Sequence, residues 1–311
     1  MALSELLESA AEQPEPGDEP EAGSGSEPEP TRQPAPPPKP AVRRPVVQGV
    51  GATVSLVALL VLGFFVYLYG LSGLSEQRAQ GVLYKSFAGE LSTAIAPTGP
   101  TTEGSPVAIL NIPAIGIRDL VVVEGTTAGD LTHGPGHVPA TVLPGQYGVS
   151  VIYGRTVTYG GPFAHLMQLQ RGDKITVTTG QGTATYIVES FGKSGSPTPD
   201  TTANRLLLET GNSSNYPNGW AQVSADLYSN PQPTPTSWPA VTAQELPLAG
   251  DPNALIPLVF WCQALLLVFL GGALAAHYWS RWAALLCAAP IALALLWSVY
   301  ENLSLLLPNL Y

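Results

Sequence analysis

Thiol chemistry is excluded from the polar middle of this 311-residue chain, because both of its cysteines lie elsewhere. Cys262 and Cys287 fall in apolar stretches near the end of the sequence. The remaining candidates for acyl transfer are the hydroxyls of Ser213 and Ser214 and the imidazole of His165. A serine enzyme needs a nucleophile, a base and an orienting group that converge in space, and this spacing does not supply them.

The other histidines do not predict a metal site. His133 and His137 lie in a turn rich in glycine and proline, without the further Cys, His or acidic ligands that a site requires. We expect His137 to be a packed or hydrogen-bonded turn residue, and we expect no metal or cofactor. A net charge of -10 gives no basic face for phosphates, so a nucleic-acid partner is also not expected.

Three long apolar runs predict that the chain crosses a membrane three times. We place the spans at residues 49–72, 254–276 and 282–307, because about 20 apolar residues cross a bilayer as a helix. Lys39, Arg43 and Arg44 precede the first span, and Arg281 lies in the turn between the other two. Basic residues favour the cytoplasmic side, so we expect the N-terminus inside and residues 107–228 and the C-terminus outside the cell.

Polar segments connect these spans. Residues 1–48 are rich in proline and glutamate and predict a disordered cytoplasmic tail. We expect a juxtamembrane helix and linker over residues 75–106 and a proline-rich linker over residues 229–253. Residues 107–228 carry seven short runs rich in Val, Ile, Thr and Tyr between turn residues, which predict strands of a closed barrel or sandwich. These runs are residues 107–112, 120–123, 149–153, 174–178, 183–188, 206–210 and 222–227.

An ordered set of motifs in residues 105–228 resembles the sortases, a family of cysteine transpeptidases that attach secreted proteins to the cell envelope. Residues 110–113 read Leu-Asn-Ile-Pro, residues 134–139 read Gly-Pro-Gly-His-Val-Pro, residues 159–163 read Tyr-Gly-Gly-Pro-Phe, and residues 172–175 read Gly-Asp-Lys-Ile. The second motif is similar to actinobacterial members of class E type. The resemblance implies a mainly β fold, an extracellular eight-stranded β-barrel with a peptide-binding groove.

The chemistry of the family uses a cysteine nucleophile, a histidine proton donor and an arginine that stabilises the oxyanion. Matching the motifs puts Arg155 at the histidine position, or makes it the motif arginine with the histidine deleted, and puts Gly211 at the cysteine position. No Arg or Lys occurs between residues 211 and 227, where the family arginine is expected. The resemblance therefore implies a degenerate member without catalytic residues. Its candidate groove residues are Tyr153, Arg155, Thr156, Glu209, Thr210 and Ser213.

We expect a membrane-anchored, catalytically inactive module that binds or scaffolds envelope or secreted proteins, with a membrane-protein partner for the spans. Two alternatives stay open, namely an active transpeptidase or peptidase with non-standard residues, and a purely structural anchor. Arg155 has two possible roles as well. It either forms an ion pair with Glu209 on a neighbouring strand, or it grips a peptide in the groove.

Overall fold

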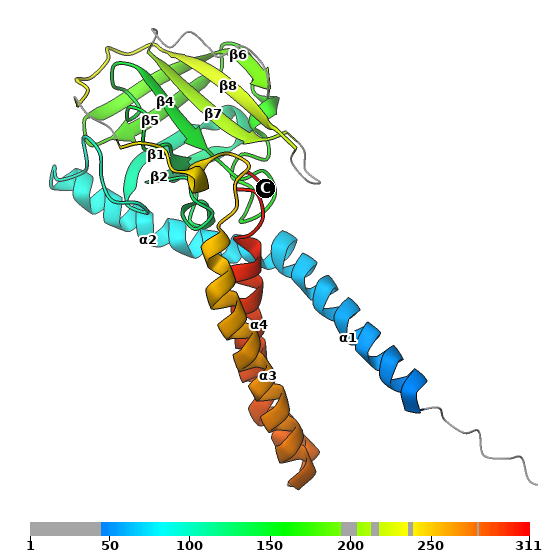
Figure 1. The fold of residues 1–311 in the computed structure, drawn as a ribbon. Helices are drawn as coiled ribbons and strands as arrows, with labels where there is room; N and C mark the ends of the chain where they lie inside the picture. The colour runs from blue at the N-terminus through cyan, green and yellow to red at the C-terminus, as the bar shows by residue number, and fades with distance from the viewer. Residues whose placement is uncertain (1–44, 194–203, 213–217, 236–238, 279) are drawn as a thin grey trace, which may run out of the picture. The chain divides into compact units, whose positions relative to one another are not determined.

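The computed structural model describes residues 45–311 except 194–203, 213–217, 236–238 and 279, and the fold is shown in Figure 1. Residues 1–44, which make up most of the expected tail of residues 1–48, therefore lie outside the described residues. Ser213 and Ser214 lie outside them as well.

A closed eight-stranded β-barrel forms the centre of the described chain, as the sequence predicted. The strands are β1 (Pro106–Ile112), β2 (Ile117–Glu124), β3 (Gly136–His137), β4 (Val149–Tyr153), β5 (Lys174–Thr179), β6 (Gly182–Lys193), β7 (Arg205–Gly211) and β8 (Trp220–Leu227). Their order around the barrel is β1-β2-β3-β4-β7-β8-β6-β5. The pairs β2–β3 and β4–β7 are parallel and the other pairs are antiparallel.

Alternation of side chains along the strands fills the barrel interior. Ser150 and Ile152 of β4 are buried while their neighbours are half-exposed, as expected for a strand with one face toward a core. Strand β7 is buried along nearly its whole length, which matches its continuous run of three leucines. Short 3-10 turns connect the strands at Pro113–Ile115, Asp130–Thr132 and Leu166–Gln168.

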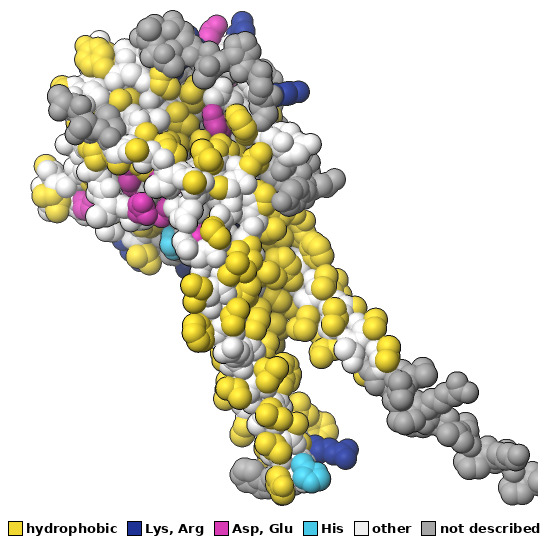
Figure 2. Space-filling view, in the orientation of Figure 1, with side chains coloured by type: hydrophobic (Ala, Val, Ile, Leu, Met, Phe, Trp, Pro, Cys, Tyr) yellow, Lys and Arg dark blue, Asp and Glu magenta, His cyan; other side chains and the backbone are white. Residues whose placement is uncertain are grey.

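Within the described residues, three helices are long and apolar enough to cross a membrane, one before the barrel and two after it. The first begins as α1 (Pro45–Val66), passes through a π-helical turn (Tyr67–Leu71) and continues as α2 (Ser72–Ser92). The others are α3 (Leu255–Tyr278) and α4 (Arg281–Ser304), which pack side by side (Figure 1). Hydrophobic side chains cover these helices, whereas the barrel surface is mixed (Figure 2).

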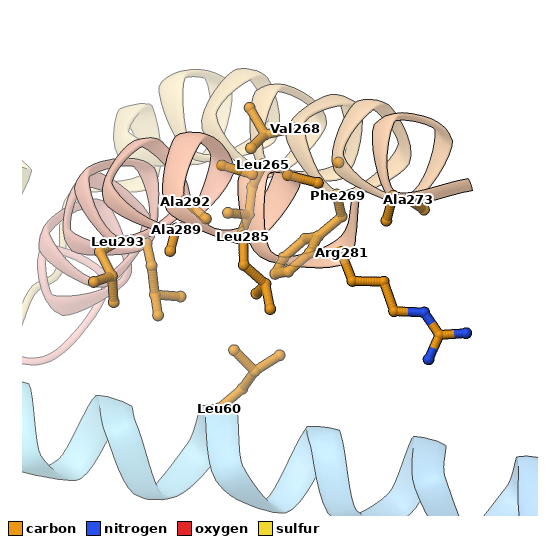
Figure 3. A pocket seen from close by; sticks show the side chains of 15 residues that line it. Leu60, Leu265, Val268, Phe269, Ala273, Arg281, Leu285, Ala289, Ala292 and Leu293 are labelled. Atoms are coloured by element: carbon orange, nitrogen blue, oxygen red, sulfur yellow. The ribbon is translucent and has the colours of Figure 1, made fainter. Parts of the chain in front are cut away.

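A hollow of about 500 Å³ separates α1 from the α3–α4 hairpin. Leu60 lines it from α1, and Phe269, Leu285 and several alanines line it from the hairpin (Figure 3). Such an apolar hollow between membrane helices is a place that lipid tails can fill, because lipid is as apolar as its walls.

Candidate functional site

The site begins where the parallel strands β4 and β7 end beside each other. Tyr153 pairs with Glu209 in the last register position of β4. The chain continues two residues further on each strand to Arg155 and Gly211. The motif resemblance predicted that Arg155 takes the place of the family histidine or is the motif arginine, and that Gly211 takes the place of the cysteine. The barrel topology brings these two positions to one end of the barrel.

Polar contacts tie the two strand ends together. The Gly154 N–H donates to the Glu209 carbonyl at 2.9 Å, and the Thr210 hydroxyl donates to the Gly154 carbonyl at 2.9 Å. The Thr156 and Thr210 hydroxyls lie 2.9 Å apart. Five of the six expected groove residues therefore cluster here, and the sixth, Ser213, lies outside the described residues.

Arg155 is fully buried, which the sequence did not predict. Its guanidinium donates to the Thr158 hydroxyl and to the Ala128 carbonyl, both at 3.0 Å, and lies 5.0 Å from the centre of the Tyr159 ring. Loss of hydration lowers the pKa of Arg155 to about 10, while the tyrosines near it act in the opposite direction. Arg155 is therefore still a cation at neutral pH, and it cannot reach a peptide in solvent in this conformation.

The expected ion pair between Arg155 and Glu209 does not form. Glu209 instead accepts a hydrogen bond from the Gln222 amide at 2.7 Å, on the neighbouring strand β8. Burial raises the pKa of Glu209 to about 7, and the bond from Gln222 only partly offsets that rise. This alternative was wrong because Arg155 turns toward its own loop, where Nη1 donates to Thr158, Nη2 donates to the Ala128 carbonyl, and the guanidinium lies over the Tyr159 ring.

The last described residues, 308–311, cover this end of the barrel. The Thr156 N–H and hydroxyl both donate to the Leu310 carbonyl, at 3.2 and 3.0 Å. The N–H groups of Val157 and Thr158 donate to the Tyr311 main-chain oxygen at 3.2 and 3.1 Å. Asn309 and Leu310 are completely buried. Residues 310 and 311 therefore lie directly against the loop that follows Arg155.

Asn309 fixes this covering segment to the preceding linker. Its side-chain amide donates to the carbonyls of Thr126, Gln244 and Leu246, at 3.1, 2.7 and 2.9 Å. Its own N–H donates to the Ala249 carbonyl at 2.8 Å. One side chain therefore joins the loop after β2, the linker before α3 and the segment after α4.

The loop that carries Arg155 also forms the joint between the barrel and the membrane helices. The Tyr159 hydroxyl lies 2.8 Å from the Ser304 hydroxyl of α4 and 3.4 Å from the Tyr67 hydroxyl of the π-helical turn. The Tyr159 N–H donates to the Ser72 hydroxyl of α2 at 2.9 Å. All four side chains are buried. A π-helical turn often marks a functional position in a helix, and here it places Tyr67 against the barrel loop.

The remaining sequence candidates lie apart from this site. His137 is buried, with Nδ1 2.9 Å from a Glu124 oxygen and Nε2 2.9 Å from the Val142 carbonyl, which confirms a packed and hydrogen-bonded residue. His165 is exposed just before a 3-10 turn, where its imidazole contacts Gln168. Within the described residues, no group of three or more Cys, His, Asp or Glu side chains is placed to hold a metal ion.

Comparison with known proteins agrees with this geometry. Residues 110–212 match the sortase domain family. No curated protein matches the chain. Among solved structures, a sortase D5 transpeptidase of Clostridium perfringens is 21% identical over 49% of this chain and 99% of its own, with a TM-score of 0.42. Sortase E of Streptomyces avermitilis is 30% identical over 42% of this chain and 91% of its own, with a TM-score of 0.36.

A third solved structure, sortase C-1 of Actinomyces oris, is 24% identical over 46% of this chain and 99% of its own, with a TM-score of 0.37. The strand order and the family match point to the same domain. The chain therefore carries a sortase-like domain, a closed eight-stranded β-barrel, and its described part also has three helices long and apolar enough to cross a membrane.

Proposed function

We propose that the chain is a membrane-anchored, catalytically inactive sortase-like module that binds or scaffolds envelope or secreted proteins. The observation that carries the proposal is the burial of the loop after β4 and its contacts with the helices. Arg155 stands at the histidine position, buried and bonded to its own loop, and the same loop joins the barrel to the membrane helices through Tyr159.

In the described residues, the two positions that we match to the family histidine and cysteine carry neither of these side chains. Gly211 has no side chain to attack a carbonyl, and an arginine with a pKa of about 10 holds its proton too firmly for general acid work near neutral pH. Hydroxyls of Thr156 and Thr210 lie close by, but within the described residues no histidine or carboxylate is hydrogen-bonded to either of them. An unactivated hydroxyl is a weak nucleophile.

The binding part of the proposal rests on the surface around Tyr153. This tyrosine is half-buried at the rim of the covered end, next to Glu209, and both belong to the expected groove. We place the barrel outside the cell and the N-terminus in the cytoplasm, on the strength of the basic residues before the first span and Arg281 between the last two. The partners in reach would then be envelope or secreted proteins.

Photo-crosslinking in native membranes tests the binding function. A benzoylphenylalanine placed at Tyr153 reports on the rim of the site, and the same group at Tyr228, which is 81% exposed, serves as the matched control. We expect a defined envelope or secreted protein crosslinked from position 153 and not from position 228. Equal products from both positions, or none from position 153, would contradict binding at this rim.

A purely structural anchor is the second candidate, and the joint favours it by a specific observation. Four buried hydroxyl groups, from Tyr67, Ser72, Tyr159 and Ser304, connect the barrel loop to two membrane segments. A connection of this kind holds the barrel on the membrane segments, which is the role of an anchor. Crosslinks that arise only from lipid-facing positions of α3 or α4, such as Leu266, would favour the anchor with a membrane partner.

A further inference from the structure

Helix α2 separates its charges between two faces. Glu76 is buried on the side that packs on the barrel, together with Phe87. Arg78 and Lys85 are exposed and lie seven residues apart, so they share one face of the helix on the opposite side. Glu90, the other acidic residue of α2, is half-buried and accepts a hydrogen bond from Ser86. The outer face of α2 therefore carries only positive charge.

Apolar side chains accompany these cations on the outer side of the helix. Leu74 is 46% exposed and Val82 is 70% exposed. Long basic side chains beside exposed aliphatic groups are typical of a helix that lies in the membrane interface, with its apolar groups at the acyl boundary and its cations among the headgroups.

Continuity with the first span holds α2 at that interface. The helix of residues 50–92 runs for 43 residues, roughly twice the length that a bilayer needs. The strongly apolar part is α1, whereas α2 packs on strands β1 and β2 (Figure 1). Gln80 fixes that packing, because its side-chain amide donates to the Val121 and His133 carbonyls at 3.0 and 2.7 Å. With one face held by the barrel, the other faces the membrane from which α1 emerges.

A hollow at the edge of the outer face could receive one headgroup. It has a volume of about 420 Å³ and is lined by Arg78, Val82 and His133, with Asp130 at its side. The Asp130 carboxylate is occupied by the Thr127 N–H and hydroxyl, at 3.2 and 2.7 Å. Arg78 and His133 therefore border the hollow beside one carboxylate, whose Oδ2 accepts both bonds from Thr127.

From these observations we propose that the outer face of α2 (Leu74, Arg78, Val82 and Lys85), with His133 at its edge, binds the anionic phospholipid headgroups of the leaflet next to the barrel. The headgroup phosphate supplies the negative charge that Arg78 and Lys85 lack among the described residues, and screening by salt weakens the attraction. The contact fixes the orientation of an otherwise acidic protein, with a net charge of -10, on a negative surface.

Fluorescence in nanodiscs tests this surface with the full-length chain. Cys262 and Cys287 are replaced by alanine, and Val82→Cys is labelled with an environment-sensitive nitrobenzoxadiazole. In nanodiscs that contain phosphatidylglycerol, we expect blue-shifted emission and a several-fold lower quenching by acrylamide than in pure phosphatidylcholine. High salt should remove the difference. Inorganic phosphate added to phosphatidylcholine nanodiscs should not reproduce it, which separates a lipid site from a site for the free ion.

Matched charge variants decide whether α2 is responsible. The pair Arg78→Gln and Lys85→Gln should abolish the response to phosphatidylglycerol, whereas Arg171→Gln and Lys174→Gln, two exposed cations near the start of β5, should keep it. All four positions are exposed or solvent-facing, so folding should persist, and an unchanged thermal unfolding curve checks this. The same emission in both lipids, or the same response in both pairs of variants, would overturn the proposal.

Discussion

Thr156 and Leu310 are joined twice although 154 residues separate them along the chain. The backbone N–H and the hydroxyl of Thr156 both donate to the Leu310 carbonyl. Thr156 follows directly on Arg155, the residue that we match to the family histidine. This end of the barrel is thus covered by the segment that follows α4, and the covering depends on hydrogen bonds that single substitutions can remove.

Thr158→Val should loosen this closure. The Thr158 hydroxyl accepts from Arg155 and donates to the Tyr311 main-chain oxygen, at 3.0 Å each, so its loss interrupts a chain of bonds that starts at a buried cation. We expect the free energy of unfolding to fall by about 1–3 kcal/mol. Hydrogen exchange at the Asn309 and Leu310 amides should also become faster.

The matched control is Thr183→Val, an exposed threonine on β6. It removes the same hydroxyl without touching the covering segment, so it should leave exchange at residues 309 and 310 unchanged. Equal exchange rates in the two variants would mean that Thr158 does not hold the segment.

Tyr159→Phe should weaken the joint between the barrel and the membrane helices. The substitution keeps the ring under Arg155 but deletes the hydroxyl that lies between Ser304 and Tyr67. Because the Ser304 hydroxyl would then lose a buried partner, we expect a loss of about 1–2 kcal/mol. Tyr147→Phe, at a tyrosine that is 59% exposed, is the control. Thermal unfolding in nanodiscs measures both, and a loss no larger than that of the control would argue against this joint.

Glu209→Gln should change how stability depends on pH. Burial raises the pKa of Glu209 to about 7, from an ordinary value near 4.5. Between these values the folded protein holds a proton that the unfolded chain has released. Stability from this group therefore falls as pH rises through that window, by up to roughly 3 kcal/mol. The amide variant keeps an acceptor for Gln222.

The melting temperatures of the wild-type protein and of Glu209→Gln are measured between pH 4 and pH 8. This is roughly the window in which buried carboxyl groups titrate. The wild-type protein should lose stability relative to the variant as pH rises. Parallel curves would show that Glu209 does not carry a raised pKa.

Gly154→Ala should be strongly destabilising, because a Cβ at this position would overlap the ring of Phe163, which is fully buried. Overpacking of this kind costs typically about 1–3 kcal/mol. Gly81→Ala on α2 is the contrasting substitution, since no atom outside the neighbouring backbone of its own helix lies within 4 Å of the new methyl group. Replacing glycine within a helix should stabilise it by about 1 kcal/mol. Chemical or thermal unfolding of both variants checks the contrast, and similar effects would contradict the packing described for Phe163.

The barrel could be predicted from the sequence because most of its strands are rich in β-branched residues between turns. Strand β4 runs over Val149–Tyr153 as expected. Strand β3 was missed, because Gly136–His137 is only two residues long and lies among prolines and glycines. Nothing in its composition predicts a strand; its place is set by pairing with Val123 and Tyr153.

The burial of Arg155 and the closure by residues 308–311 could not be predicted from local patterns. Asn309 finds its carbonyl partners 63 to 183 residues away, at Leu246, Gln244 and Thr126. Arg155 finds the Ala128 carbonyl 27 residues away. Such contacts follow from the tertiary arrangement, and the polar types of these residues fit an open groove equally well.

Peptide turnover by the full-length protein in nanodiscs tests the central claim most directly. The protein is incubated with extracts of envelope proteins and an added amine nucleophile, and a catalytically active sortase serves as the positive control. Mass spectrometry then detects cleaved or ligated products, and a fluorophosphonate probe detects an activated serine, including Ser213 and Ser214. We predict no product above the rate without protein and no labelled serine. Turnover, or a labelled serine whose alanine variant loses activity, would contradict an inactive module.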